Sequence, residues 1–268
     1  MTHGDFCQEV VDRLKQARKY RHLCEDTLYR VADWAGRRHP NGKTAVRAAK
    51  RKLHQVYGAY LDAFRFARVE ELLGGLSPSL PDADLRAACY EILQCHASTA
   101  ERLPIMAGFY RDLFEEIGQP RTLLDLACGL HPFALPWMGL DRAVRYVAYD
   151  IDHRLVGAAN DFFRCVGHGP GAVCRDILVS GPDLEADVVF LFKSVPCLEQ
   201  QMKGATGDLL RRLRADYVVV SFPVRTLGGR EKGMAQHYDA LMDRMVDDLK
   251  VPVRKMAYPV ETFYVLGG

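Results

Sequence analysis

Carboxylates and a glycine stand where three successive short apolar runs, which begin at residue 122, come to an end. Gly129 closes Asp125-Leu-Ala-Cys-Gly129 after the first run, Asp150 follows the second, and Asp176-Ile177 follows the third. In an open parallel sheet the ligand crevice lies outside the carboxyl ends of the strands, so these residues are expected to meet there. One carboxylate can accept hydrogen bonds from both hydroxyls of a ribose, and the next can accept from an adenine amino group while Ile177 packs on the ring. Glycine permits close approach of the backbone. The pattern predicts a pocket for an adenosine-containing ligand.

The ligand class follows from what the sequence lacks. It contains no G-x-G-x-x-G segment and no phosphate-cradling P-loop, which speaks against dinucleotides and nucleoside triphosphates. S-adenosylmethionine fits, because it needs acids for its ribose and a cation for its carboxylate. Arg102 is the candidate cation. Ser98-Thr-Ala-Glu101 has capping-box spacing and predicts a helix from Thr99 to about Ile117, with Arg102 in its first turn. The helix dipole disfavours a cation there, which favours a functional role.

Seven short runs rich in β-branched and aromatic residues are expected to form the sheet. Helix-length segments separate most of them, which is typical of parallel strands with both faces covered. Only Pro259–Glu261 separates the last two, so one antiparallel strand is expected. The expected fold class is therefore α/β, with a seven-stranded, mostly parallel sheet and an α-helical N-terminal extension. A sheet of this kind resembles that of the Rossmann-like class I methyltransferases, which is an analogy of architecture. The runs are Thr122–Ala127, Tyr146–Tyr149, Ala172–Cys174, Asp187–Phe192, Tyr217–Phe222, Val253–Tyr258 and Thr262–Leu266.

Apolar residues at three- and four-residue steps predict helices before the sheet. They cover residues 5–20, 26–36, 43–73 and 82–95. The Gly- and Pro-rich stretch Gly74–Pro81 predicts a domain boundary. We expect a helical, basic, rRNA-binding domain over 1–77. A methyltransferase domain is expected over 78–268, with 82–117 as its helical lead-in.

Positive charge is concentrated in the first part of the chain. Residues 1–60 carry 13 Lys and Arg against 6 Asp and Glu, although the whole chain has a net charge of only +2. No acidic residue lies between Asp33 and Asp62. A solvated helix face is the plain interpretation, but so many like charges without counter-ions favour an external polyanion, and nucleic-acid backbone is the natural partner. The expected contacts are Lys43, Arg47, Lys50, Arg51 and Lys52.

Other classes of protein fit poorly. No apolar stretch approaches the ~20 residues of a membrane span, and the N-terminus has no signal-peptide pattern. None of the eight cysteines forms a C-x-x-C pair, so reduced thiols and no metal site are expected. We expect a cytoplasmic protein, monomeric and not associated with membranes.

Beyond these patterns, the sequence resembles the aminoglycoside-resistance 16S rRNA methyltransferases that modify N7 of guanine 1405. The similarity runs through nearly the whole chain in the order of the family's blocks. The His-Ala-Ser-Thr-x-Glu-Arg and Leu-Gly-Gly-Arg blocks are specific, whereas Asp-x-x-x-Gly is not. Thr226 stands where the family has Ser, and His131 where Asn is familiar. The blocks are Lys19–Cys24, Gly58–Tyr60, His96–Leu103, Asp125–Pro132, Phe192–Glu199 and Ser221–Met234.

The resemblance implies S-adenosyl-L-methionine as cofactor and the 16S rRNA decoding region of the 30S subunit as substrate, with aminoglycoside resistance as the outcome. It also implies a helical N-terminal extension that docks on the 30S subunit, in agreement with the basic residues. The implied cofactor contacts are His96, Ser98, Arg102, Ala127, Gly129, Asp150, Asp176 and Ile177, together with Tyr60, Phe192 and Gln201.

Guanine N7 carries a lone pair and no proton, so no general base is expected, and catalysis should come from positioning and electrostatics. The target base is expected to leave its helix and enter the pocket. Lys193 and three cations around Gly228-Gly229 are expected to hold the flipped nucleotide and its phosphates. These three are Arg225, Arg230 and Lys232.

Four alternatives are weighed at this stage. The residues alone do not separate guanine 1405 N7 from the neighbouring adenine 1408 N1. Pro196-Cys197 mimics the nucleophile of cytosine-C5 methyltransferases, although a small hydrophobe is the better interpretation of Cys197. Amino-group methyltransferases usually carry Asn/Asp-Pro-Pro-aromatic where Lys193-Ser-Val-Pro196 stands. The chain could also be a non-catalytic ribosome-binding factor on a methyltransferase-like core.

Overall fold

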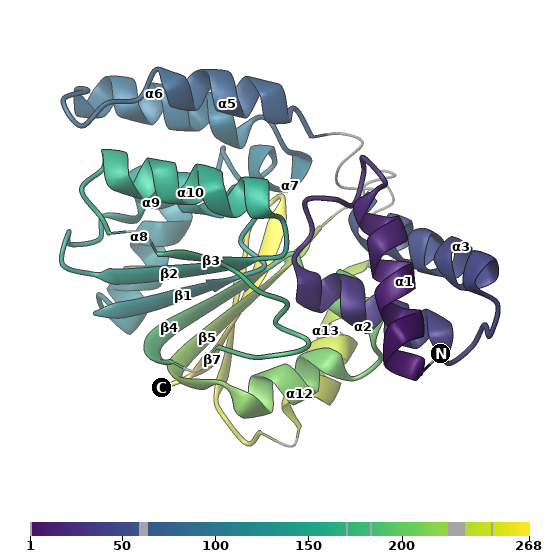
Figure 1. The fold of residues 1–268 in the computed structure, drawn as a ribbon. Coiled ribbons are helices and arrows are strands. Elements are labelled where there is room, and N and C mark those ends of the chain that lie inside the picture. Colours follow the sequence, from purple (N-terminus) through teal and green to yellow (C-terminus); the bar gives the residue numbers. More distant parts are fainter. Residues whose placement is uncertain (1, 59–63, 170, 183, 225–233, 248) are drawn as a thin grey trace.

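A seven-stranded sheet forms the centre of the molecule (Figure 1). The structure is a computed structural model that describes residues 2–268 apart from 59–63, 170, 183, 225–233 and 248. The strand order is β3-β2-β1-β4-β5-β7-β6, and only β7 runs against its neighbours. The predicted sheet and its single antiparallel strand are thereby confirmed. The strands are β1 Thr122–Leu126, β2 Arg145–Asp150, β3 Ala172–Cys174, β4 Glu185–Phe192, β5 Arg214–Pro223, β6 Val253–Ala257 and β7 Glu261–Gly267.

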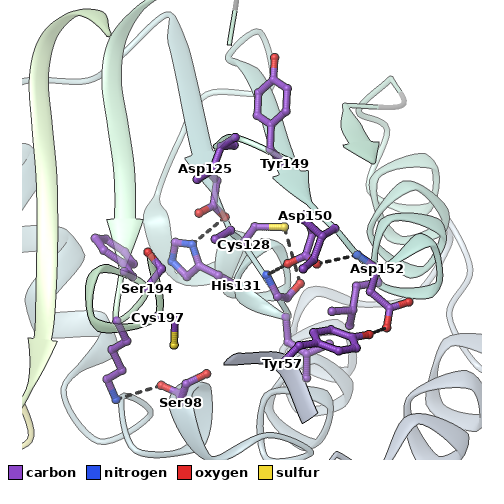
Figure 2. Close-up of a pocket in the computed structure, with 18 of the residues that line it drawn as sticks. Tyr57, Ser98, Asp125, Cys128, His131, Tyr149, Asp150, Asp152, Ser194 and Cys197 are labelled. Carbon is purple, nitrogen blue, oxygen red and sulfur yellow. Dashed lines mark hydrogen bonds and ion pairs between the residues drawn. The ribbon is translucent and has the colours of Figure 1, made fainter. Parts of the chain in front are cut away.

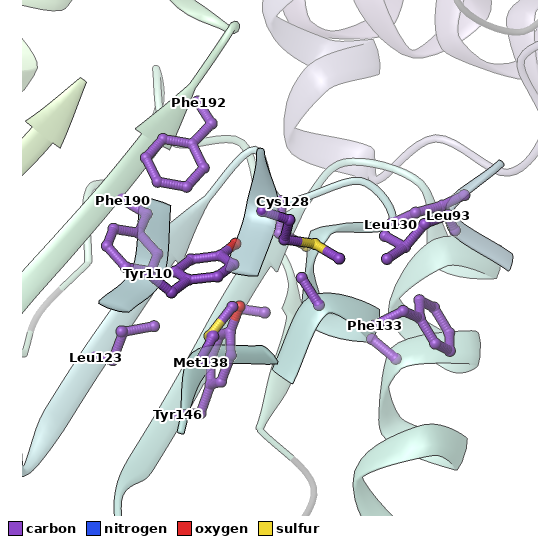
Figure 3. Close-up of a cluster of buried hydrophobic side chains, with 14 of the residues drawn as sticks. Leu93, Tyr110, Leu123, Cys128, Leu130, Phe133, Met138, Tyr146, Phe190 and Phe192 are labelled. Carbon is purple, nitrogen blue, oxygen red and sulfur yellow. The ribbon is translucent and has the colours of Figure 1, made fainter. Parts of the chain in front are cut away.

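Both faces of the sheet are apolar, because successive side chains of a strand point to opposite sides. Leu123 of β1 packs in one buried cluster with Phe190, and Leu124 packs in the other with Val189. Figure 3 shows the first cluster, with Tyr110 beside Phe190. The strands can therefore hold polar residues only near their ends, which is where the sequence places its acids.

Helices cover both faces of this sheet. One face is covered by α8 (Met106–Ile117), α9 (Leu135–Met138) and α10 (His153–Cys165), against which α5 (Phe66–Gly74) and α6 (Asp82–Leu93) pack. The other is covered by α11 (Val195–Gln201), α12 (Ala205–Arg212) and α13 (Met234–Val246). Among the described residues, no helix has both the length and the apolar character to cross a membrane.

The N-terminal helices form a unit with a core of their own. It contains α1 (His3–Lys15), α2 (Glu25–Gly36), α3 (Gly42–Leu53) and the π-helical turn η1 (His54–Gly58). Thr2 and Asp5 form a capping box on α1, and the Asn41 side chain caps α3. The unit lies at the carboxyl edge of the sheet (Figure 1), where Cys24 N donates to Ile151 O and His153 N to His22 O. The predicted helical extension is confirmed.

Two helix predictions were wrong. The predicted helix 43–73 is interrupted, and α5 packs with α6 and α10 against the sheet's core rather than with the N-terminal unit. This packing favours a boundary between the two domains that lies N-terminal to Phe64. The predicted domain boundary after residue 77 stays a prediction.

The predicted helix 99–117 is in fact two helices, α7 (Ala97–Ala100) and α8, joined by a turn over 101–105. Pro104 in this turn has no amide hydrogen to donate to a helical carbonyl. The capping box is also absent, because His96 rather than Ser98 is the N-cap, and Glu101 pairs with Lys193. Arg102 therefore does not occupy a helix's first turn.

Candidate active site

A pocket opens at the carboxyl ends of β1, β2, β3 and β4, beside the N-terminal helices (Figure 2). The sheet reverses its strand order between β1 and β4, and ligands of open α/β sheets bind at this switch point. All the described residues predicted to bind the cofactor line this one pocket, as does Lys193. They are His96, Ser98, Arg102, Ala127, Gly129, Asp150, Asp176, Ile177, Phe192 and Gln201.

Asp150 ends β2 and is held by backbone amides from both sides. Gly129 N donates to Asp150 Oδ2 at 2.9 Å, and Asp152 N donates to Asp150 Oδ1 at 2.9 Å. Burial raises the pKa of Asp150 to about 6 even though these amides favour its charged form. Each carboxylate oxygen keeps a further acceptor site, which suits it to receive two hydroxyl hydrogens.

The backbone leaves β1 and β4 in an unusual conformation. Ala127 and Lys193 have φ of 53° and 52°, and Gly129 has φ of 54°. Side chains other than glycine rarely adopt this left-handed region, and such residues concentrate at functional sites. A Cβ on Gly129 would meet nothing within 4 Å, so the glycine is needed there for its φ rather than for space.

A buried ion cluster lies at one end of the pocket. Arg102 Nε donates to Glu261 Oε2 at 2.9 Å and Nη2 donates to Oε1 at 2.6 Å, while the guanidinium carbon lies 4.6 Å from the ring centroid of Phe192. Lys193 Nζ donates to Ser98 O at 3.1 Å and lies 3.4 Å from Glu261 Oε2. Burial opposes ionisation of Glu261, but Arg102 and Lys193 hold its pKa below the ordinary value. Arg102 is thus fixed by a bidentate partner from β7.

A second buried network supports the loop after β1. Asp125 Oδ2 lies 2.8 Å from His131 Nδ1 and accepts from the Tyr146 hydroxyl at 2.8 Å. His131 Nε2 in turn contacts the Tyr110 hydroxyl. Figure 2 shows the contact between Asp125 and His131 as a dashed line, with Cys128 next to it. These contacts fix the course of the chain through Gly129, and they give His131, the departure from the family pattern, a structural role.

The remaining end of the pocket joins the sheet to the N-terminal helices. Asp176 Oδ2 accepts from Thr27 Oγ1 at 2.9 Å and from Arg30 Nε at 2.8 Å, and Arg30 Nη2 donates to Gln201 Oε1 at 2.5 Å. Ile177, 4% exposed, supplies an apolar wall beside Asp176. An acid next to an apolar surface is the arrangement expected for the amino edge and face of adenine.

The sequence of this chain matches a known protein family over most of its length. The model of the ribosomal RNA methyltransferase (FmrO) family matches residues 16–262. This chain belongs to the FmrO family. Relatives named 16S rRNA (guanine(1405)-N(7))-methyltransferase support the assignment over nearly the whole length. The protein from Micromonospora echinospora is 34% identical over 98% of this chain and 97% of its own. The protein from Frankia casuarinae is 38% identical over 88% of this chain and 86% of its own.

Solved structures give the same result for the fold of this FmrO-family chain. The 16S rRNA methyltransferase RmtF, in complex with S-adenosyl-L-homocysteine, has a TM-score of 0.82 at 34% identity and covers 98% of each chain. The 16S rRNA methylase RmtB has a TM-score of 0.78 at 26% identity, covering 97% of this chain and 98% of its own.

The residues predicted to bind RNA do not gather at one place in the described structure, unlike the residues predicted to bind the cofactor. Tyr60, Arg225, Arg230 and Lys232 lie outside the described residues. On α3, Lys43, Arg47 and Arg51 are exposed, Lys50 is half-buried, and no described acidic residue forms an ion pair with any of the four. Lys52 instead turns inward, where Nζ donates to Gln200 O at 2.8 Å and lies 5.3 Å from the Trp34 ring. The ammonium of Lys193 is likewise held inside the protein.

Sequence reasoning missed several residues of the site in this FmrO-family chain: Arg30 and Ser194 line the pocket, while Thr27 and Glu261 hydrogen-bond to residues that line it. Glu261 could have been suspected as a lone acid opening an apolar strand. Thr27 and Arg30 carry no local signal, because their partner Asp176 lies 149 and 146 residues away. Ser194, beside Lys193, has a buried hydroxyl oxygen to which no described group is hydrogen-bonded.

Proposed function

We propose that this chain transfers a methyl group from S-adenosyl-L-methionine to N7 of guanine 1405 of 16S rRNA, within the 30S subunit, and thereby confers aminoglycoside resistance. The observation that carries the proposal is the convergence of the cofactor-type residues on one pocket at the switch point of the sheet. The relatives of this name, aligned over almost the whole chain, supply the target atom. We also propose that the protein acts in the cytoplasm as a monomer.

The chemistry of the pocket fits an adenosine-containing cofactor. The carboxylate of Asp150 stands at the end of β2 with acceptor sites to spare, and the apolar side chains of Ile177 and Phe192 line the walls. The buried Ser194 Oγ lines the same pocket with no hydrogen-bond partner among the described groups. A buried hydroxyl without a partner is costly, so it points to a ligand that satisfies it.

The roles of the residues follow from their positions. We assign the ribose hydroxyls to Asp150, the adenine amino group to Asp176, and the adenine face to Ile177. The carboxylate of the cofactor's amino-acid part is assigned to the Arg102 end of the pocket, where Glu261 fixes the guanidinium. When bound, S-adenosylmethionine supplies an electrophilic methyl group on a positively charged sulfur.

The target atom explains why no general base is needed. Guanine N7 has a free lone pair, so a nucleophilic attack in line with the sulfur–carbon bond creates no proton to remove. The contribution of the protein is then to hold the two reactants in register and exclude water, which can supply several orders of magnitude in rate. We propose that the backbone after β4, held by Lys193 N donating to Ser221 O at 3.0 Å, forms one wall for the incoming base.

The experiment that tests this function uses 30S subunits and S-adenosylmethionine with a labelled methyl group. We expect label in 16S rRNA with the native chain and almost none with Asp150→Asn, which loses the negative charge and replaces one of the two acceptor oxygens for the ribose with a donor. An Asp187→Asn variant is the control, because Asp187 contacts the Arg121 and Thr122 amides away from the pocket. Binding to 30S subunits without any incorporation of label would favour the non-catalytic ribosome factor instead.

A further inference from the structure

We propose that Arg30, from helix α2 of the N-terminal unit, is a positioning residue of the cofactor pocket. It holds the carboxylate of Asp176 so that one oxygen edge is presented to the 6-amino group of the adenine. The proposal rests on the proposed function, because it presupposes an adenosine-containing ligand. It adds that the basic N-terminal unit is itself part of the cofactor site.

Arg30 and Thr27 both donate hydrogen bonds to the same oxygen of the Asp176 carboxylate. Arg30 Nε lies 2.8 Å from Asp176 Oδ2 and Nη2 lies 2.7 Å from the same oxygen. Thr27, one helical turn before Arg30, adds a hydroxyl donor at 2.9 Å. The same Nη2 reaches Gln201 Oε1 at 2.5 Å, so one guanidinium orients two polar residues that line the pocket.

The hydrogen bonds to the Asp176 carboxylate decide how many of its lone pairs can accept from a ligand. A carboxylate offers about four lone-pair sites, two on each oxygen. The donors from Thr27 and Arg30 occupy Oδ2 fully, and Leu178 N occupies one site on Oδ1 at 2.9 Å. Among the described donors, none occupies the second lone pair of Asp176 Oδ1, and this single acceptor matches a single amino hydrogen.

Charge and burial make Arg30 the main partner of this acid. Asp176 is 2% exposed, and the Arg30 side chain is only 16% exposed. A carboxylate this deeply buried costs free energy unless an opposite charge and hydrogen bonds compensate it. The salt bridge that compensates Asp176 comes from the N-terminal unit, because its other two donors, Thr27 and the Leu178 amide, are neutral.

A specificity measurement tests the proposal better than loss of activity does. We would measure the affinities of S-adenosylhomocysteine and S-inosylhomocysteine by calorimetry. The inosine analogue replaces the 6-amino donor with a carbonyl, which would face the Asp176 carboxylate with no hydrogen to share. We expect the native chain to prefer the adenosine compound by at least about tenfold, the scale of one lost charge-assisted hydrogen bond.

Arg30→Met should remove most of this preference, while Arg30→Lys, which retains the charge but not the fork, should restore part of it. Arg37→Met is the matched control at the C-cap of the same helix, because Arg37 pairs with Asp33 and its side chain is 69% exposed. The control should keep the native preference. Unfolding temperatures measured in parallel exclude a general loss of structure.

The possible outcomes separate the two proposals. If the native chain fails to bind S-adenosylhomocysteine, the proposed function fails. If the native chain prefers the adenosine compound and folded Arg30→Met keeps the same preference, the role of Arg30 is refuted while the function stands. If the native chain shows no preference, the Asp176 acceptor and the role of Arg30 both fall, and the methyltransferase assignment remains.

Discussion

Arg102 and Glu261 form a buried ion pair whose disruption is expected to lower the stability of the protein. The Glu261 side chain is 0% exposed and Arg102 4%, and both arginine hydrogen bonds go to that carboxylate. The Ser221 hydroxyl donates to the same group. Such a pair adds little net stability when complete, but removing one partner leaves an uncompensated buried charge.

We therefore predict that Glu261→Gln lowers the free energy of unfolding by about 3–5 kcal/mol, measured by urea denaturation. The double variant Arg102→Met, Glu261→Met should recover much of the loss, because it removes the charge as well as its partner. The control is Glu185→Gln, in an exposed pair with Arg214, which should leave the unfolding midpoint unchanged. Equal midpoints for Glu261→Gln and the native chain would contradict the role given to Glu261.

Asp150 makes cofactor binding depend on pH. Its pKa, raised by burial from 3.8 to about 6 in the free protein, means that acid conditions protonate it and remove a ribose acceptor. Affinity for S-adenosylhomocysteine should be full well above pH 6 and should fall as the pH drops through about 6. The effect on stability has the opposite sign. Because the pKa of Asp150 is higher in the folded protein than in the unfolded chain, its contribution to stability is fully present below the unfolded value of 3.8. This contribution is lost as the pH rises through about 6.

Isothermal titration across this pH range checks the prediction. Asp150→Asn should bind more weakly and without the step near pH 6. His96 also lines the pocket, but burial and Lys193 lower its pKa, so the Asp150 variant distinguishes the two groups. A step of native size in Asp150→Asn would assign the titration to another residue.

Cys197 lies in the pocket lining, which makes its role testable. If the target were cytosine C5, its thiolate would have to form a covalent bond, and replacement would abolish turnover. For guanine N7 no nucleophile is needed, so we predict that Cys197→Ala retains methylation of 30S subunits within about threefold of the native rate, a loss of less than 1 kcal/mol. An inactive variant with normal cofactor affinity would overturn the N7 assignment.

At the scale of elements, helix α3 presents a group of exposed cations that form no ion pair with a described acidic residue. Lys43, Arg47 and Arg51 are exposed, and none has a described acidic partner. Each phosphate neutralised releases counterions, so binding to 30S subunits should weaken steeply with salt. Replacing all three with Gln should reduce the slope of log affinity against log salt by about two to three.

The control for this experiment replaces three arginines that already pair with acids at the surface, Arg164, Arg211 and Arg214. Filter-binding titrations at several salt concentrations would compare the two triple variants. We expect the control variant to keep the native slope. A native slope in the α3 variant would show that this basic face does not meet RNA phosphates.

Most helices and strands could be predicted from the sequence, and the wrong prediction over 99–117 has a local cause. All seven strands lie where short runs flanked by turn residues predicted them. The signal is densest in the strands buried on both faces, such as β4, and weakest in the exposed edge strand β6. The helix predicted over 99–117 failed because the spacing of Ser98 and Glu101 imitates a capping box. Glu101 instead pairs with Lys193, and the chain turns at Pro104. A local pattern does not reveal that a distant cation competes for the same side chain.

At the scale of the whole molecule, the pocket is built from segments that are remote in the sequence. The acids at the strand ends could be predicted, because the topology of a parallel sheet brings such ends together. The partners of Arg30 and Glu261 could not be predicted, because they lie 146 and 159 residues away in the sequence. The N-terminal unit, read from sequence as an RNA-docking appendage, therefore also reaches into the pocket.

The most direct test of the function maps the methylated atom. Purified 30S subunits would be incubated with the protein and S-adenosylmethionine, and the 16S rRNA would be treated with borohydride and aniline, which cleave the chain at N7-methylguanine. We predict cleavage at guanine 1405, which depends on both the protein and the cofactor and is absent with Asp150→Asn. Methyl incorporation without this cleavage, with a modification at adenine 1408, would contradict the assignment.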